Sequence, residues 1–352
     1  MKKQDERHIL WLTPGFPVDE SDTRCIPPLQ SLAIGLRDCS GVRLTIISLH
    51  YPFEKKRYLW NDIPVHACGA SNRPLVLRLP IWKKVIDIAK AINKEHPIDQ
   101  IHSFWLSECA WLGQKLHHRF SKPHLVTLMG QEGLKGNVYE PWIHLEKLKI
   151  AAISPYQFAL FEKRKKRKPD HIIPWGIDRE NLPLLGNAER EIDILGVGSL
   201  IALKDFKTFI RIVANMKKEK PDLKCALVGD GVEKKELEKM ANDLGLADCL
   251  KFHGLVSREM VFRLMAKSRC LLHPSQYESF GMVFLEALAS GMHIVSREIG
   301  IARKMDQWTI GDNLEELEAG VKKILGKTNQ SSVILFDQES TVKTYVDLYR
   351  IM

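Results

Sequence analysis

The sequence lacks the features that mark several classes of protein. It contains no run of about 18 apolar residues, so no membrane-spanning helix is expected. The first residues, MKKQDERHILWL, pass directly from charged residues into a strand-like segment, without the long apolar region and cleavage site of a signal peptide. The seven cysteines are scattered and show no C-x-x-C spacing. This pattern predicts a reducing, cytoplasmic location without structural zinc.

The chain is also not dominated by charge of one sign: 52 basic residues are largely offset by 43 acidic ones, which leaves a formal charge of +9. The basic residues cluster in Lys55–Arg57, Lys83-Lys84, Lys217-Lys218 and, most densely, Lys163–Lys168. Each run is first interpreted as solvated surface. No recognition motif or basic–aromatic stacking pattern accompanies them, so nucleic acid is not an expected partner. An anionic membrane surface suits such runs better, since it contributes roughly 1 kcal/mol per nearby basic residue.

What the sequence does contain is enough apolar material for a large core. With 352 residues, of which 45% are hydrophobic, it is long enough for about two domains. Strand-like segments alternate with helix-like ones, which predicts mainly parallel sheets with helices on both faces. The predicted strands are 8–12, 42–49, 65–68, 100–103, 124–128, 151–154, 171–173, 192–197, 223–228, 250–252, 270–272 and 293–296. The predicted helices are 28–36, 81–93, 105–120, 206–216, 234–244, 258–266, 314–325, 338–352 and one beginning at 280.

A change of composition predicts the boundary between two domains. Residues 174–186, PWGIDRENLPLLG, are rich in proline, glycine and asparagine and are interpreted as a linker. The strand–helix alternation then restarts at residue 192. We therefore expect one domain over 1–178 and a second over 179–337, with the helix 338–352 packing back on the first.

One segment, residues 273–291 (HPSQYESFGMVFLEALASG), combines a loop with the start of a helix. The first N–H groups of a helix lack partners and its dipole is positive there, so a phosphate is expected at residues 280–283. Glu278 stands before this helix and Glu286 stands within it. Alone, the two glutamates are read most simply as solvated charges.

The other strands of the second half end in small or charged residues as well. Gly198 and Lys204 follow the first strand, Gly229–Gly231 follow the second, and His253-Gly254 follow the third. Because ligands of such sheets bind at the carboxyl ends of the strands, these residues are expected to converge. Lys204 would then face a phosphate at the helix start, where a compact cation stabilises a diphosphate leaving group.

These motifs resemble the retaining glycosyltransferases with the GT-B architecture, specifically the group usually numbered family 4. The matching text is VGSLIALKDFKTFI, LVGDGVEKKELEKMANDLGL, KFHGLV and HPSQYESFGMVFLEALASGMHIVS, over most of residues 190–298. Glu278 and Glu286 stand at the spacing of the E-x7-E motif of that family, and PWGID resembles its linker motif. The resemblance implies two Rossmann-like doubly wound domains that face a central cleft.

The resemblance also implies a role for each matching residue. Glu286 would bind the ribose of a nucleotide diphosphate sugar, and Glu278 would contact the donor sugar as a catalytic residue together with Lys204. The remaining donor-binding positions would be Gly15, Gly198, Ser199, Gly229, Leu255, Val256, Phe280, Gly281, Met282 and Val283. No metal and no cofactor are implied, since Lys204 and the helix N-terminus would stabilise the leaving diphosphate.

The implied activity is a hexosyltransferase-type transfer, with retention of configuration, to a hydroxyl of a glycan or lipid-linked glycan. It would serve envelope polysaccharide or glycolipid synthesis, in the cytoplasm or peripherally on the inner face of the cell membrane. Membrane contact is expected through Lys163–Lys168 and through the helix that carries Trp82, Lys83 and Lys84. Glu278 and Glu286 lie two helical turns apart, roughly 11–12 Å along the axis, so they are not a glycosidase pair.

Departures from the family pattern keep two alternatives open. Ser199 replaces an arginine, and Met129 stands where many members have a histidine. The acceptor or cleft candidates are therefore Gln131, Glu132 and His102, although a strand-end histidine is by default a packing or hydrogen-bonding residue. The alternatives are a nucleotide-sugar epimerase of the same fold and a non-catalytic nucleotide-sugar-binding protein.

Overall fold

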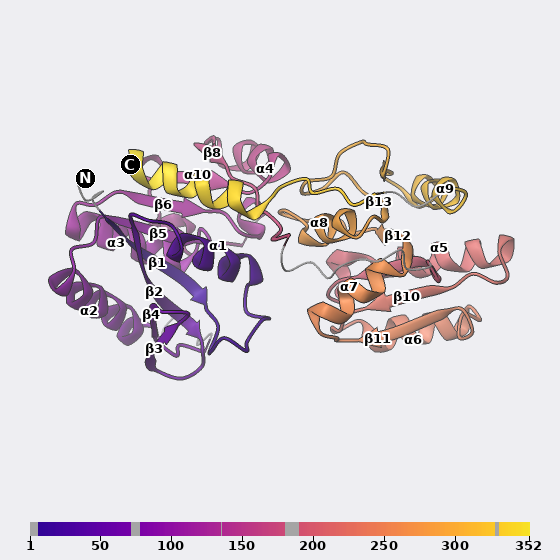
Figure 1. Ribbon diagram of the computed structural model, residues 1–352, viewed down its shortest axis with the longest axis horizontal. Helices are drawn as coiled ribbons and strands as arrows, with labels where there is room; N and C mark the ends of the chain where they lie inside the picture. The colour runs from indigo at the N-terminus through magenta and orange to yellow at the C-terminus, as the bar shows by residue number, and fades with distance from the viewer. Residues whose placement is uncertain (1–5, 72–77, 135, 180–189, 328–330) are drawn as a thin grey trace. The chain divides into compact units, whose positions relative to one another are not determined.

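The computed structural model describes residues 6–71, 78–134, 136–179, 190–327 and 331–352. The chain divides into two compact units (Figure 1). Unit 1 consists of Met1–Gly176 and Gln338–Met352, and unit 2 consists of Ile177–Asp337. The chain thus returns to unit 1 with its last helix. The linker predicted over 174–186 lies outside the described residues from position 180 onward.

Unit 1 is built on an eight-stranded sheet with the order β3-β4-β2-β1-β5-β6-β7-β8. All neighbouring strands of this sheet pair in parallel except β3 and β4, which are antiparallel. The long central strands β1 and β2 are buried along almost their whole length, as expected for strands covered on both faces. The strands are β1 Arg7–Gly15, β2 Val42–Tyr51, β3 Lys56–Trp60, β4 Ile63–Ala67, β5 Gln100–Phe104, β6 His124–Thr127, β7 Lys149–Ala152 and β8 His171–Ile172.

Helices of unit 1 cover both faces of this sheet. On one face α2 (Leu79–Glu95) and α3 (Glu108–Phe120) share a hydrophobic core with β1, β2 and β5. On the other face α1 (Pro27–Arg37) packs against the C-terminal helix α10 (Gln338–Ile351), the yellow helix of Figure 1. The tyrosines Tyr345 and Tyr349 of α10 are fully buried against the sheet. The last helix is therefore part of the unit 1 core.

Unit 2 is a six-stranded parallel sheet with the order β11-β10-β9-β12-β13-β14. The strands are β9 Ile192–Val197, β10 Cys225–Val228, β11 Leu250–Gly254, β12 Ser268–His273, β13 His293–Ser296 and β14 Trp308–Ile310. The chain builds outward from β9 to β11, and then crosses to β12 on the other side of β9. The order reverses between β9 and β12, and in sheets of this kind ligands bind outside the carboxyl ends of the strands at that switch point.

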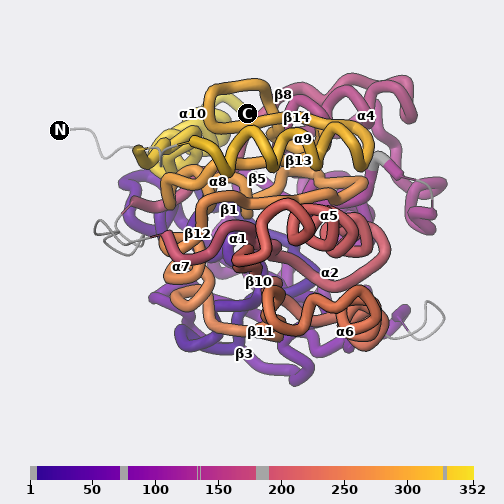
Figure 2. The backbone as a smooth tube through the Cα atoms, turned by 90° about the vertical axis from the view of Figure 1, so that its right-hand side faces the viewer, coloured from indigo at the N-terminus to yellow at the C-terminus, as the bar shows by residue number. Residues whose placement is uncertain are grey.

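Helices α5 (Phe206–Glu219), α6 (Lys234–Asp243) and α9 (Leu314–Leu325) pack on one core cluster of unit 2 (Figure 2). The helices α7 (Arg258–Ala266) and α8 (Met282–Ala289) contact each other. Within the described part of the chain, none of these helices or those of unit 1 combines the length and apolar composition needed to cross a bilayer.

The predicted fold class is confirmed, since both units are α/β layers on mainly parallel sheets. The bounds predicted for β9, β13, α7 and α9 are those observed. Besides the short 3-10 helices, the edge strands β3 and β14 and the α-helix α4 (Pro155–Lys165) were not predicted. Strand β3 reads KRYLW and α4 ends in a lysine-rich turn, and neither has the strong apolar pattern of a buried element.

Helix α3 also begins later than predicted, at Glu108 and not at Trp105. Trp105 adopts a left-handed backbone conformation with a φ of 67°, which an α-helix does not accommodate. This turn separates the end of β5 from the helix.

Candidate functional site

The loops that follow β9 and β10 lie unusually close together at the switch point of unit 2. The N–H of Gly198 donates to the carbonyl of Val228 at 3.0 Å, and the N–H of Leu200 donates to Asp230 at 2.9 Å. A Cβ atom at Gly229 would lie 1.8 Å from the carbonyl oxygen of Gly198. Glycine is therefore required at position 229 for the two strand ends to approach, which leaves backbone close to any ligand there.

A short 3-10 helix, η5 (Ala202–Lys204), connects β9 to α5 and is fixed to the loop before α8. The carbonyl oxygen of Leu203 accepts the N–H of Gln276 at 2.9 Å and the hydroxyl of Ser275 at 3.2 Å. These bonds hold η5 beside the β12–α8 loop. The last residue of η5, Lys204, is thereby directed at the segment that carries Glu278.

Lys204 and Glu278 form an ion pair between their Nζ and Oε1 atoms. The same carboxylate oxygen accepts a hydrogen bond from Nε2 of His273, the last residue of β12, at 2.7 Å. All three side chains are largely buried: 18% of Lys204, 13% of Glu278 and 1% of His273 is exposed. The structure thus places Lys204 beside the segment that leads into α8, as predicted. The contact of His273 with this carboxylate was not predicted, because strand-end histidines were assigned in general terms to packing or hydrogen bonding.

The carboxyl of Glu278 is held in its charged form. Burial alone would raise its pKa, but the hydrogen bond and charge of His273 and the charge of Lys204 outweigh burial and lower the pKa below its ordinary value. Glu278 therefore offers a negative charge and a hydrogen-bond acceptor to a ligand. Lys204 offers a positive charge at the same position.

Helix α8 begins at Met282, two residues later than predicted. Gly281 is its N-cap residue in the left-handed region, with a φ of 88°, and a Cβ atom there would lie 2.6 Å from the ring of Phe284. Phe280 precedes the helix and is buried. The predicted phosphate contact of the Phe280 N–H is therefore not a contact to the helix N-terminus. The free N–H groups of the first turn begin at Met282 and Val283.

One side of α8 is left partly exposed. Met282, Val283 and Glu286 are half-buried, whereas Phe284, Leu285 and the following residues of the helix are buried. Residues three and four positions apart share one face of a helix, so Glu286 lies in line with the first turn of α8. A ligand held at the N-terminus can thus extend along the helix to Glu286.

Glu286 has a partner that the sequence did not indicate. Nη2 of Arg258, the first residue of α7, lies 3.2 Å from Oε1 of Glu286. Burial raises the pKa of Glu286 above its ordinary value, and Arg258 only partly opposes this effect. No sequence spacing could have identified Arg258, because α7 and α8 are separate helices that meet only in the folded unit.

The other donor-site candidates of unit 2 lie at neighbouring strand ends. Gly198 and exposed Ser199 follow β9. Leu255 and Val256 follow β11, and 65% of Leu255 is exposed. An apolar side chain that is open to solvent at the carboxyl end of the sheet can contact the face of a flat ring. The structure thus places these candidates at the edge where the fold predicts a ligand, and their individual roles stay predictions.

The candidates of unit 1 have different surroundings. Gly15 is the last residue of β1 and is buried, and its donor-binding role stays a prediction. Gln131 is exposed in η2 (Gln131–Gly133) and remains available. His102 is fully buried: Nδ1 bonds to the Tyr349 hydroxyl at 2.6 Å and Nε2 bonds to Thr127 at 2.8 Å. Its candidate role at an acceptor site is incorrect, because both ring nitrogens are used in the core.

Glu132 is also withdrawn as an acceptor contact. Its side chain is buried and accepts the backbone N–H groups of Met129 at 2.8 Å and Gly130 at 2.6 Å. Burial raises the pKa of Glu132, although these hydrogen bonds act in the opposite direction. Glu132 therefore shapes the turn after β6 from within, and it is not open to a ligand.

A buried polar cluster in unit 1 was not predicted. The carboxylate of Glu108 lies 2.8 Å from Nη1 of Arg78 and 3.0 Å from Nε2 of His50, and it accepts the indole N–H of Trp82. Trp82 is only 8% exposed, so the indole itself is not a membrane contact, whereas the contact expected through Lys83 and Lys84 of the same helix stays a prediction. The predicted position of Trp82 on an amphipathic helix is correct, but it occupies the inner face.

The basic run at the end of α4 is partly engaged with carboxylates of unit 1. Lys165 pairs with Glu140, and Arg167 lies 2.8 Å from Asp170. Among the residues that the structure describes, no group of three or more histidine, cysteine, aspartate or glutamate side chains is arranged to hold a metal ion.

Comparison with known proteins identifies the family of unit 2. Residues 178–307, which include strands β9 to β13, the switch point and helix α8, match the model described as glycosyl transferases group 1. This part of the chain belongs to that family. The chain is 27% identical over 221 residues to an uncharacterised glycosyltransferase of Methanocaldococcus jannaschii, which is 60% of each chain.

Other relatives are similar to the chain over shorter stretches. A D-inositol 3-phosphate glycosyltransferase of Streptomyces avermitilis is 33% identical over 125 residues, which is 33% of this chain and 27% of the relative. The chain thus matches 60% of the length of the archaeal relative and less than a third of the Streptomyces enzyme.

Solved structures match over the whole chain. HepE of Anabaena, in complex with UDP and glucose, has 19% identity and a TM-score of 0.69, with 99% of this chain and 100% of that chain covered. Sucrose-phosphate synthase of Thermosynechococcus elongatus has 18% identity and a TM-score of 0.75, with 98% and 99% covered. These similarities show that the chain has the GT-B fold of two α/β domains on mainly parallel sheets.

Proposed function

We propose that the protein transfers a sugar from a nucleotide diphosphate sugar to a hydroxyl of a glycan or lipid-linked glycan, with retention of configuration. The observation that carries this proposal is the ion pair of Lys204 and Glu278 at the β9–β12 switch point, directly before the N-terminus of α8. It brings a cation, a carboxylate and free backbone N–H groups to one place. A diphosphate sugar has charges and hydroxyls that complement these groups.

The proposed roles follow from the chemistry of each group. The Nζ of Lys204 and the first N–H groups of α8 take up the charge that develops on the leaving diphosphate. Glu278, charged and held by His273, accepts hydrogen bonds from hydroxyls of the donor sugar. Glu286, on the same face of α8, accepts hydrogen bonds from the ribose. The nucleotide named with HepE, UDP, is a donor moiety of this kind.

A leaving diphosphate that is stabilised by a lysine and a helix N-terminus needs no metal in this proposal. The acceptor enters from an unassigned surface, and envelope polysaccharide or glycolipid synthesis is the proposed setting. Addition of a chelator is expected to leave transfer unchanged. A dependence on divalent metal would contradict this part of the proposal.

A thermal-shift screen of nucleotide diphosphate sugars tests the donor site directly. A ligand present at 100 times its dissociation constant stabilises the fold by about 2.7 kcal/mol. We expect a stabilising shift with at least one donor and its loss in Glu286→Ala. Absence of any shift would overturn the proposal.

The stabilising donor is then incubated with candidate acceptors, and the configuration of the product is determined by NMR. Turnover of the donor without acceptor would favour an epimerase. Binding without transfer to any acceptor would favour a binding protein. An inverted product would contradict retention.

A further inference from the structure

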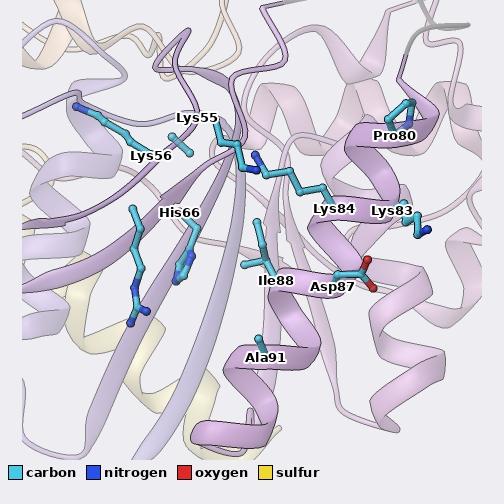
Figure 3. A pocket seen from close by; sticks show the side chains of 11 residues that line it. Lys55, Lys56, His66, Pro80, Lys83, Lys84, Asp87, Ile88 and Ala91 are labelled. Carbon is cyan, nitrogen blue, oxygen red and sulfur yellow. The ribbon is translucent and has the colours of Figure 1, made fainter.

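Unit 1 contains a basic pocket that the transferase site in unit 2 does not use. The pocket has a volume of about 700 Å³, which is in the range of small-molecule sites. It lies between the edge of the sheet and helix α2 (Figure 3). Five cationic side chains line it: Lys55, Lys56, Arg57, Lys83 and Lys84.

The cations come from two elements that are not adjacent in sequence. Lys56 and Arg57 begin β3 and Lys55 directly precedes it, whereas Lys83 and Lys84 belong to the first turns of α2. Figure 3 shows Lys55 and Lys84 pointing toward one another from the two segments, with Lys56 and Lys83 directed outward on either side. Because two separate segments contribute charge of one sign, the fold itself brings together groups that repel one another.

Acidic side chains do not neutralise this pocket. Asp87 is the single carboxylate among its lining residues, and it already lies 3.1 Å from Nζ of Lys90, outside the pocket. Across the residues that the structure describes, none of the five cations forms an ion pair. Burial, together with the charge of Lys55, lowers the pKa of Lys84.

The chemistry of the lining specifies an anion with more than one charge. Lysine is a compact point charge that binds phosphate, and Arg57 adds a fork that suits two phosphate oxygens. The side chains of Ala67, Ile88 and Ala91 supply an apolar wall beside the charges. We propose that this pocket binds a phosphate-bearing ligand, either the phosphate head of a lipid or a soluble phosphate ester. The proposal concerns unit 1 alone and goes beyond the proposed transfer reaction.

Titration of the full chain with inorganic pyrophosphate, followed by calorimetry, tests the pocket. The variant Lys55→Gln, Arg57→Gln, Lys83→Gln removes three exposed charges from its lining. Each basic group near an anionic surface contributes about fivefold in affinity, so the triple variant is expected to weaken binding about 100-fold. Thermal unfolding of the variant shows whether it remains folded, as expected for exposed side chains.

Two comparisons locate the binding. The control variant Lys94→Gln, Lys147→Gln, Lys343→Gln removes the same charge from exposed positions of unit 1 outside the pocket, and it should bind pyrophosphate as the wild type does. Lys204→Ala, in unit 2, should retain the binding event that the pocket variant loses. Because the donor site is also expected to bind diphosphates, this variant distinguishes pyrophosphate binding in the pocket from binding at the donor site. The two proposals can therefore fail independently.

Vesicles of phosphatidylcholine, with and without phosphatidic acid, distinguish the two sources of phosphate. The ligand is a lipid if the wild type sediments with vesicles that contain phosphatidic acid, if pyrophosphate prevents this sedimentation and if the pocket variant does not sediment. Pyrophosphate binding without such sedimentation assigns a soluble ester. Equal binding of pyrophosphate by the wild type and the folded pocket variant would overturn the proposal, as would equal losses in the pocket and control variants.

Discussion

Lys204 and Glu278 form an ion pair across the switch point of the unit 2 sheet although 74 residues separate them in the sequence. The pair exists because η5 and the β12–α8 loop are bonded through the carbonyl of Leu203. A charged donor would meet both partners at once. Lys204 would bind the diphosphate and Glu278 would bind the sugar. The ion pair therefore positions both side chains before the ligand binds.

Substitution of Lys204 by alanine is expected to lower turnover by about two to three orders of magnitude. Loss of one preorganised contact to a developing negative charge costs roughly 2.7–4 kcal/mol in the barrier. Steady-state kinetics with a donor found in the thermal-shift screen measures this effect. Lys207→Ala, which removes a lysine of α5 from an exposed pair with Glu236, is the control. Equal turnover of Lys204→Ala and wild type would reject the role.

Glu278→Gln is expected to lower stability at neutral pH and to have a smaller effect in acid. The folded-state pKa of Glu278 lies below its ordinary value, so its charged form stabilises the fold above the unfolded-state pKa. This contribution is lost as the pH falls through the folded-state pKa. Denaturant unfolding of both proteins over a pH series measures the difference. A difference that stays constant with pH would mean that ionisation of Glu278 contributes nothing.

Nucleotide binding is expected to weaken on acidification at a higher pH than an ordinary glutamate would produce. Glu286 must be ionised to accept hydrogen bonds from two hydroxyls, and burial raises its pKa above 4.5. The same shift means that ionised Glu286 costs stability as the pH rises from the unfolded-state to the folded-state pKa. Calorimetry with UDP as a function of pH reports the step. The variant Glu286→Gln should bind UDP weakly and should show no such pH-dependent step. An identical pH profile in this variant would assign the step to another group.

Gly229→Ala is expected to destabilise unit 2 by about 1–3 kcal/mol through overpacking. Its Cβ atom would stand 1.8 Å from the Gly198 oxygen, and the φ of 143° is unfavourable for alanine. Thermal unfolding measures the loss. Gly326→Ala is a matched control, since it has an ordinary backbone conformation and its nearest contact would be 4.0 Å away. Equal stability of the two variants would show that the strand-end loops can separate without cost.

Tyr349→Phe is expected to destabilise unit 1 by about 1–3 kcal/mol. The Tyr349 hydroxyl bonds to His102 and accepts the indole N–H of Trp11 at 3.1 Å, and both partners are buried. Its removal leaves these polar groups without a bond in the core. Lys343→Gln, exposed on the same helix, is the control for chemical denaturation. Unchanged stability of Tyr349→Phe would show that α10 is held by apolar contacts alone.

Much of the fold followed from local sequence patterns. Strands such as β9 and β13 are short and mostly buried, and helices such as α7 and α9 are apolar at helical spacing, so their bounds could be predicted. Edge strand β3 could not, because an edge strand buries little and its sequence carries no such pattern. The start of α8 was placed too early because Phe280 fits the apolar spacing but packs outside the helix.

Part of the candidate site could likewise be predicted from the sequence, and part of it could not. The spacing of Glu278 and Glu286 and the position of Lys204 after a strand were visible in the sequence, since strand ends converge in parallel sheets. Arg258 and His273 were not, because their roles arise from contacts between separate elements. Nor could a strand-end position distinguish a core histidine such as His102 from an open one: that depends on α10, which returns from the far end of the chain to cover it.

The sequence by itself therefore determined the α/β class, the order of most strands and helices, and the residues at the strand ends of unit 2. Only the tertiary structure decided which of these residues are open to a ligand, which partners set their charge and which lie in the core. The physical reason is that hydrophobic periodicity is local, whereas burial and ion pairing depend on segments far apart in sequence. The Lys204–Glu278 pair and the basic pocket beside α2 both belong to this second category.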